Sequence, residues 1–471
     1  MTPAGVGRPA RHVPRVAVVS LYFNMYDEQM AGGFAADREA FLGQAISVLS
    51  SDAQVLDSWL LVTVDDAALA NATLVTLDVD AVVLVPAMVA PPVLVRRALA
   101  GVDAPVLLWN VPEVEELTST WSQPEGASRS THVGCEMAAN VLRRDGVIFE
   151  TVTCAFGDLS RHGRLHRTLR ALAVASLVRR ATVLRLGEVQ TGYDDVVADA
   201  SALQRLGVRE VCVSLEDWTR AVASTPDASA AEMASRCDGW RRDRVDEAVM
   251  ATSARIAAAL AGLVASSQAD CGTVNCHSPY FRQHQELGVT ACLAVTLLTG
   301  QGVPFSCTGD LPAALALLIG QRLAGAALYG ELYTPETGKG EMAFAAGGEG
   351  DPALAASGTL RLIPNRMYPG PGGEGIGVAF PVAEGPATIV SVGVGPDRWQ
   401  VVWATGTVTS RDFPDFDGPY GGWRFDSGDL EDCVTRWIAA GPSHHHALVP
   451  GHLDVEMPVV ARAAAMDSVR V

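Results

Sequence analysis

Short apolar runs alternate with helical stretches through the first third of the chain, and this pattern limits the possible folds more than any other feature. Residues 15–21, 81–86 and 105–110 are rich in Val and Leu. Apolar runs of this length are typical of strands buried on both faces of a parallel sheet. Residues 37–50, between the first two runs, have a helical pattern. The alternation predicts an open, doubly wound α/β domain.

The same alternation continues after about residue 145. The predicted strands are residues 147–154, 181–186, 209–214 and 304–307, and the predicted helices are residues 243–266, 291–298 and 311–323. This second series predicts another α/β domain built on a parallel sheet.

From about residue 355 the pattern changes, because Gly and Pro become dense. Residues 389–394 and 398–404 are predicted to be antiparallel strands joined by a Gly-Pro-Asp turn, and residues 429–440 are predicted to form a helix. We therefore expect an α/β protein with two doubly wound parallel-sheet α/β domains followed by a smaller β-rich C-terminal domain. The expected boundaries are 1–160, 161–345 and 346–471.

Composition excludes several classes of protein. Hydrophobic residues make up 49% of the chain and charged residues 19%, which is enough for a large core. The net charge of −18 disfavours a nucleic-acid partner, because the surface repels phosphate. The sequence shows neither a targeting signal nor about 18 consecutive apolar residues, so we expect no membrane association. Nine cysteines without a CxxC pair suggest buried thiols in a reducing, cytoplasmic protein.

Unusual polar residues concentrate between residues 271 and 351. Asp310 follows a predicted strand, where α/β proteins place ligand-binding groups, but it could also only cap the helix that follows. Glu331 has apolar and aromatic neighbours, so it is either paired, bound to a cation, or exposed in a loop. Glu349 and Asp351 lie in a Gly-rich turn, which could equally be a solvated acidic loop.

Three histidines, residues 444–446, follow the predicted helix at 429–440. They could be metal ligands, or they could add positive charge at the end of that helix. Two carboxylates and a histidine suit Mn²⁺ or Mg²⁺ better than a structural zinc site. Such an ion can hold two neighbouring oxygens of a polyol while a carboxylate moves a proton between adjacent carbons. This is the chemistry of aldose–ketose interconversion.

Several segments make the chain similar to the L-arabinose/L-fucose isomerase superfamily. Residues 304–317 (PFSCTGDLPAALAL) and 326–333 (AALYGELY) resemble its Gly-Asp turn, helix and acidic residue. Residues 437–448 (WIAAGPSHHHAL) resemble its C-terminal signature, in which Trp, Ala-Gly and paired histidines have the same spacing. Residues 275–277 resemble a segment of less characterised branches. The order of α/β, α/β and β-rich parts also agrees with the family's subunit.

The resemblance implies Mn²⁺, or another divalent metal, held by two acidic residues and a histidine in a homo-oligomer, a trimer or hexamer with shared sites. Glu331 matches the second acidic ligand and His445 the histidine ligand, while Asp310 lies in the Gly-Asp turn. Two departures stand out. Thr308 occupies the position of a glutamate ligand, and the Gly348-Glu349-Gly350 run lacks a histidine found in the family.

We therefore expect a metal-dependent, aldose–ketose isomerase-like enzyme that acts on a sugar through a cis-enediol. Asp310, Glu331 and His445 would hold the metal, and Glu331, Asp310 and Glu349 would be catalytic. His277, Asn275 and His444 would bind the substrate. The alternatives are a metal-dependent epimerase or lyase on a sugar-like compound, which the altered Thr308 position favours, and a non-catalytic sugar-binding protein.

Overall fold

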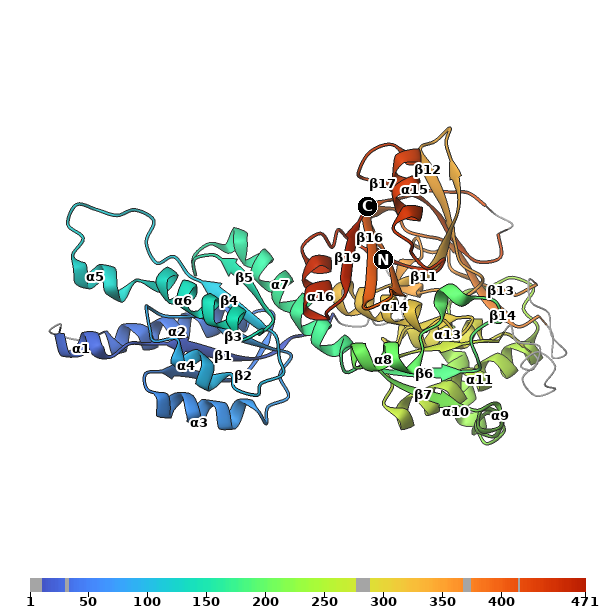
Figure 1. Ribbon diagram of the computed structural model, residues 1–471. Coiled ribbons are helices and arrows are strands. Elements are labelled where there is room, and N and C mark those ends of the chain that lie inside the picture. Colours follow the sequence, from blue (N-terminus) through green and yellow to red (C-terminus); the bar gives the residue numbers. More distant parts are fainter. Residues whose placement is uncertain (1–10, 30–33, 277–288, 367–373, 414–415) are drawn as a thin grey trace. The chain divides into compact units, whose positions relative to one another are not determined.

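The computed structural model describes residues 11–29, 34–276, 289–366, 374–413 and 416–471 (Figure 1). The chain forms two compact units. The N-terminal unit takes in residues 12–177 and 455–464, and the second unit takes in residues 178–454 and 465–471. The three-domain boundaries expected from the sequence stay a prediction.

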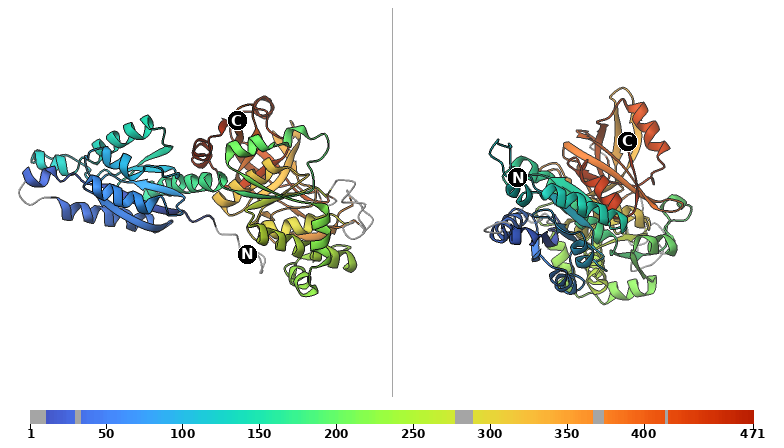
Figure 2. Two further views of the ribbon diagram at one scale, coloured as in Figure 1. Left: turned by 60° about the horizontal axis from the view of Figure 1, so that its bottom comes forward. Right: turned by 60° about the vertical axis from the view of Figure 1, so that its left-hand side comes forward.

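The N-terminal unit contains a five-stranded parallel sheet in the order β2-β1-β3-β4-β5, with helices on both faces (Figures 1 and 2). The strands are β1 (Arg15–Leu21), β2 (Gln54–Leu61), β3 (Ala81–Leu84), β4 (Val106–Asn110) and β5 (Phe149–Thr153). The helices are α1 (Met25–Gln29), α2 (Ala35–Leu49), α3 (Val64–Leu74), α4 (Val93–Ala98), α5 (Gln123–Ser128), α6 (Thr131–Arg144), α7 (Leu159–Val178) and α16 (Glu456–Ala463).

Continuous burial of β1 explains why the sequence pattern identified this sheet. Residues Val16 to Leu21 are all at most 1% exposed. Ala17 and Val19 belong to one core cluster with side chains from α3, α4 and α6, whereas Val16 and Val18 lie outside that cluster. Both faces of the strand are therefore covered, as in a doubly wound sheet. The sequence pattern assigns the strand at residues 147–154 to the second α/β series. In the structure this segment instead forms β5, which pairs with β4 in the sheet of the N-terminal unit.

The second unit begins with a four-stranded parallel sheet in the order β10-β9-β6-β7. Its strands are β6 (Thr182–Leu186), β7 (Arg209–Val213), β9 (Cys271–Val274) and β10 (Phe305–Cys307). The accompanying helices are η1 (Asp194–Val196), α8 (Ala200–Leu206), α9 (Leu215–Ala223), α10 (Asp227–Ser235), α11 (Glu247–Ser267), α13 (Cys292–Gly300) and α14 (Leu311–Ala324). The two parallel-sheet α/β parts of the expected fold class are thus confirmed.

The rest of the second unit is a ten-stranded, mainly antiparallel sheet. Strand β16 pairs with both β15 and β17, so β16, β15, β18, β11, β12 and β17 close into a barrel. The strands are β8 (Arg241–Arg242), β11 (Leu328–Glu336), β12 (Glu341–Ala345), β13 (Arg361–Pro364), β14 (Ile376–Pro381), β15 (Gly385–Val394), β16 (Trp399–Thr409), β17 (Pro419–Phe425), β18 (His446–Pro450) and β19 (Asp467–Arg470). Helices η2 (Pro352–Leu354) and α15 (Leu430–Ala439) accompany them. The predicted hairpin across Gly395–Asp397 and the β-rich C-terminal part are confirmed.

Pairing between β11 and β18 brings two distant parts of the chain together. Gly330 pairs with His446, so Glu331 and His445 lie next to this pair at the end of the ladder. A side chain at Gly330 would not fit, because its Cβ would lie 2.4 Å from the Phe344 ring. The close packing of β11, β12 and β18 thus sets the distance between the acidic residue and the histidine loop.

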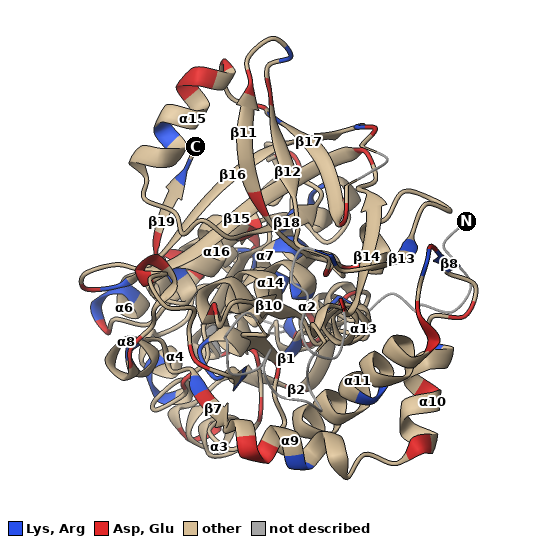
Figure 3. Cartoon of the chain, turned by 90° about the vertical axis from the view of Figure 1, so that its right-hand side faces the viewer, with Lys and Arg blue, Asp and Glu red and all other residues tan. Residues whose placement is uncertain are grey.

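Helix α11 is, among the described residues, the one helix long and apolar enough to cross a membrane. Its Met250, Ile256 and Leu260 side chains lie in the core cluster of the second unit, and the helix packs against α9, α10 and α13. Apolar residues of α11 therefore contribute to the core of the second unit. Acidic residues colour the starts of α9, α10 and α15 in Figure 3, where negative charge is favourable at a helix N-terminus.

Gly272 in β9 tests the packing of the parallel sheet beside the site. A Cβ there would lie 2.2 Å from the Phe305 ring and 2.8 Å from the Leu184 carbonyl oxygen. We expect Gly272→Ala to lower the free energy of unfolding by about 1–3 kcal/mol through overpacking. Gly262→Ala, in the exposed face of α11 with open space around it, should raise that free energy by about 0.5–1 kcal/mol. Urea denaturation measures both, and equal effects would contradict this packing.

Candidate functional site

A tight turn between β10 and α14 places Asp310 at the site. Thr308 and Gly309 have φ values of 59° and 79°, so the chain turns sharply after Cys307. Thr308 is strained there, since a β-branched residue rarely adopts this left-handed conformation. Asp310 is fully buried, and its Oδ1 accepts a hydrogen bond from the backbone N–H of Ala313 at 2.8 Å. The predicted helix-capping role of Asp310 is confirmed, and its second oxygen remains for the site.

His445 lies between two carboxylates. Its Nδ1 donates to Asp310 Oδ2 at 2.7 Å, and its Nε2 lies 3.4 Å from Glu331 Oε1. Burial alone lowers the pKa of His445, but the hydrogen bonds and charges of Asp310 and Glu331 outweigh it and raise this pKa to about 9. The imidazole, 2% exposed, is thus an imidazolium held by two anions when nothing else occupies the site. The sequence-predicted meeting of these three side chains is present within one chain.

A second histidine is held in a similar way. His444 Nδ1 donates to Asp195 Oδ2 at 2.6 Å, and the His444 and His445 ring centroids are 3.8 Å apart. Burial tends to raise the pKa of Asp195, but the hydrogen bonds from His444 lower it overall. Each imidazole therefore has Nδ1 fixed by a carboxylate, and Nε2 of His445 faces Glu331. Histidines that bind metals are commonly oriented by a carboxylate in this manner.

A pocket of about 220 Å³ opens beside His445. Its lining contains acidic, aromatic and thiol side chains. The lining residues are Tyr193, Cys276, Thr290, Cys292, Cys307, Thr308, Tyr329, Glu331, Tyr333, Gly347, Glu349 and His445. A lining that combines polar groups with aromatic side chains suits a small polyhydroxylated ligand.

Glu349 is buried in this pocket and is not part of a solvated loop. It is 4% exposed, and burial raises its pKa. Asp351 is also fully buried, where it accepts from the backbone N–H groups of Ala327 and Ala353. The Gly-rich turn therefore has two separate roles. Asp351 stabilises the backbone, whereas Glu349 presents a buried carboxyl group whose pKa is raised by that burial.

Glu331, His444 and His445 form a group that fits a divalent ion. One ligand atom from each lies within 4.8 Å of the others. A carboxylate oxygen and imidazole nitrogens are donors that Mn²⁺ and similar ions accept. Asp310, which the sequence predicts as a third ligand, uses its two oxygens on the helix cap and on His445. Its role as a ligand stays a prediction.

The predicted substrate-binding residues have different outcomes. His444 lies beside His445, as described above. Asn275 is 2% exposed, and its side-chain amide donates to the Glu188 carbonyl oxygen at 2.7 Å. His277 lies outside the described residues. Substrate binding by each of these residues stays a prediction.

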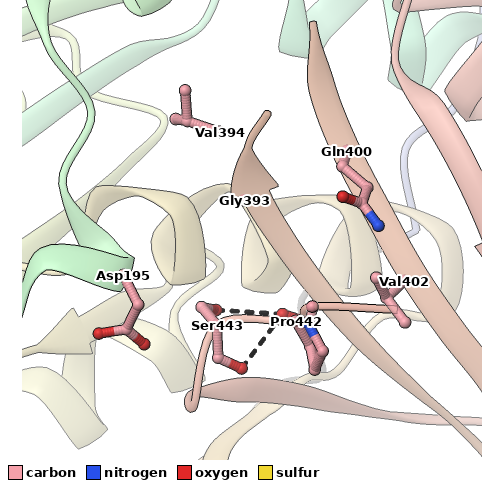
Figure 4. Close-up of a pocket in the computed structure, with 9 residues that line it drawn as sticks. Asp195, Gly393, Val394, Gln400, Val402, Pro442 and Ser443 are labelled. Atoms are coloured by element: carbon pink, nitrogen blue, oxygen red, sulfur yellow. Dashed lines mark hydrogen bonds between the residues drawn. The ribbon is translucent and has the colours of Figure 1, made fainter. Parts of the chain in front are cut away.

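Sequence reasoning missed Asp195, the partner of His444. It lies in η1, within a polar stretch that has no periodic pattern. Asp195 also borders a second cavity of about 170 Å³, where Figure 4 shows it with Ser443 and Gln400. Ser391 and Ser443 hydroxyls lie 3.0 Å apart at this cavity. The sequence gives only a weak signal for Asp195, namely the acidic pair Asp194-Asp195 ahead of helix α8.

Two known proteins are similar to this chain over most of its length. They are the sulfoquinovose isomerases of Priestia aryabhattai and Priestia megaterium, each 23% identical over 383 residues, which cover 77% of this chain and 79% of the relative. No family model matches the chain. This distant similarity supports an isomerase-type enzyme with a sugar-isomerase-like function. It is consistent with an isomerase superfamily and does not single out the arabinose/fucose isomerase family that the motifs resemble.

The charge on Asp310 should control the protonation of His445. In Asp310→Asn the helix cap is kept, because Asn is an equally good N-cap, but one of the two anions beside the imidazole is lost. We expect the pKa of His445 to fall from about 9 towards its ordinary value of 6.5 in the metal-free protein. Histidine titration by NMR measures this change. Asp195→Asn is the matched control, and an unshifted His445 pKa in Asp310→Asn would contradict the geometry.

Proposed function

We propose that this protein is a metal-dependent sugar isomerase that interconverts an aldose and a ketose through a cis-enediol. The observation that carries the proposal is the arrangement of His445 between Asp310 and Glu331, with the His444–Asp195 pair beside it. The distant similarity to sulfoquinovose isomerases supports the same reaction class.

Glu331, His444 and His445 would hold a divalent ion such as Mn²⁺. The bound ion would supply positive charge that polarises a sugar carbonyl and orients its neighbouring hydroxyl. Asp310 would act as a positioning residue, because it fixes the ring of His445 and leaves Nε2 facing the pocket. Asp195 would do the same for His444.

Glu349 is the group best suited to move the proton between C1 and C2. It lies in the pocket, and its burial raises its pKa. A carboxyl group with a raised pKa is closer to the operating pH, where acid and base forms are both accessible. Glu331 would then be a ligand of the ion, and Glu331 and Glu349 would have separable roles.

Thr308 in the pocket lining favours a second candidate reaction. The arabinose isomerases that the chain resembles have a glutamate at this turn, so the group that delivers the proton to the enediol differs here. Protonation of an enediol at C1 gives the ketose, whereas protonation at the opposite face of C2 gives the epimeric aldose. A metal-dependent epimerase is therefore the alternative, and product analysis separates the two.

The substrate, the compartment and the assembly belong to the same proposal. We infer a small sugar of the arabinose, fucose or sulfoquinovose type as the substrate, in a cytoplasmic homo-oligomer. Incubation of the purified protein and Mn²⁺ with these three sugars and with common pentoses and hexoses, followed by chromatography of ketoses and epimers, tests the reaction. Absence of both products from every sugar would overturn the proposal in favour of a sugar-binding protein.

Substitutions of Glu331 and Glu349 should affect ion binding and turnover differently. We expect Glu331→Gln to lose both the bound ion and turnover, because it removes a ligand charge. Glu349→Gln should bind the ion as the wild type does and yet lose about 10²–10⁴-fold in kcat, the usual contribution of a general acid or base. Metal analysis and initial rates of both variants test this. Unchanged turnover in Glu331→Gln would remove it from the mechanism.

Binding of the ion should depend on pH because His445 must lose a proton to accept it. Its pKa of about 9 in the metal-free site means that the imidazole is protonated at neutral pH. We expect the apparent affinity for Mn²⁺ to rise by at most about tenfold per pH unit from near pH 6.5 towards pH 9. Calorimetric titration across this range measures the slope and the proton released. A pH-independent affinity, or the same slope in His445→Gln, would contradict His445 as a ligand.

A further inference from the structure

Tyr329 lines the pocket beside His445 and carries a buried hydroxyl group. Tyr329 is 5% exposed and lines the pocket, and its Oη has no hydrogen-bond partner among the residues that the structure describes. Buried tyrosine hydroxyls in folded proteins are usually paired, because an unpaired one loses its bond to water and gains nothing. An unpaired hydroxyl on a residue that lines a pocket is therefore a candidate for a hydrogen bond to a bound ligand.

Its position on β11 places this hydroxyl next to the candidate ion site. Tyr329, Glu331 and Tyr333 alternate along the strand, and all three line the pocket. The backbone of Tyr329 is held by pairing with Ala447 of β18. Its ring packs against the His445 imidazole with centroids 4.8 Å apart. The phenol is thus fixed in place before any ligand binds.

The chemistry of the phenol group determines which hydrogen bond it can make. A neutral phenol offers one O–H donor to a neutral oxygen acceptor. A sugar supplies such acceptors on most of its carbons.

We propose that Tyr329 is a substrate-binding residue that donates its hydroxyl proton in a hydrogen bond to an oxygen of the sugar. The ligand class is a polyhydroxylated carbonyl compound. The inference rests on the proposed function for the identity of the reaction. It adds a specificity contact that neither the motifs nor the relatives assign.

The substitution Tyr329→Phe tests this contact because it removes only the hydroxyl. We expect kcat/KM for the preferred sugar to fall about 3–10-fold, the usual effect of losing one neutral hydrogen bond. At the same time the melting temperature without ligand should stay the same or rise, since a buried unpaired hydroxyl is lost. Loss of activity together with unchanged or higher stability is a signature that a structural role would not give.

The control is Tyr420→Phe, which removes the hydroxyl of another buried tyrosine of the same unit outside the pocket lining. It should leave kcat/KM unchanged. If Tyr329→Phe leaves kcat/KM unchanged, or lowers the melting temperature more than Tyr420→Phe does, the inference is overturned.

A readout without turnover separates this inference from the proposed reaction. Pentitols and hexitols are polyols that cannot isomerise, and they should raise the melting temperature of the wild type more than that of Tyr329→Phe. If the wild type converts no sugar but shows this difference, the reaction is wrong and the Tyr329 contact stands. Equal stabilisation of both proteins by every polyol overturns the contact.

Discussion

The pairing of His445 with Asp310 and Glu331 is the interaction on which the rest of the site depends. An imidazolium buried to this extent would be unstable without counter-charges, and two carboxylates from separate elements supply them. Asp310 belongs to the end of the parallel sheet, whereas Glu331 and His445 belong to the barrel. The same contact therefore joins the two sheets of the second unit and positions His445 and Glu331 in the pocket lining.

Local sequence pattern predicted the elements whose burial is continuous. The strand at residues 15–21 and the hairpin across Gly395 were predictable, because an apolar run and a turn motif are visible within a short window. Strand β11 was not predicted, since it carries Glu331 between two tyrosines and pairs with β18, more than a hundred residues away. Its polar residues serve the pocket, so their pattern does not resemble that of an ordinary half-buried strand.

For the site, the rule that ligands bind at strand ends and the spacing of the C-terminal motif were enough to choose Asp310, Glu331 and His445. These two signals could not show which of the three residues would bind an ion and which would orient another side chain. Whether Asp310 faces an ion or orients a histidine depends on the exact direction of the Thr308–Gly309 turn, which is a tertiary property. The unpaired hydroxyl of Tyr329 and the contact of Asp195 with His444 likewise exist only after the barrel has closed.

Several unfavourable features gather in this one pocket. Thr308 has a strained backbone, Glu349 is a buried acid, and Tyr329 has an unpaired hydroxyl. Each lowers stability, and such features persist where binding or catalysis needs them. The cap on α14 and the dense packing of β11 against β12 and β18 stabilise the frame around them. This separation of a stable frame from costly site residues is expected of a preorganised active site.

The three cysteines of the pocket bear on which ion the proposed site would prefer. Cys276, Cys292 and Cys307 line the wall beside Glu349, and a thiolate there would compete for soft ions such as Zn²⁺. A hydrogen bond with Cys276, together with burial, raises the pKa of Cys307, and burial with the charge of Glu349 raises that of Cys292. Both therefore remain thiols, which are poor ligands. Without Cys292 and Cys307, the carboxylate and imidazoles of the proposed site are a set that suits an ion accepting oxygen and nitrogen.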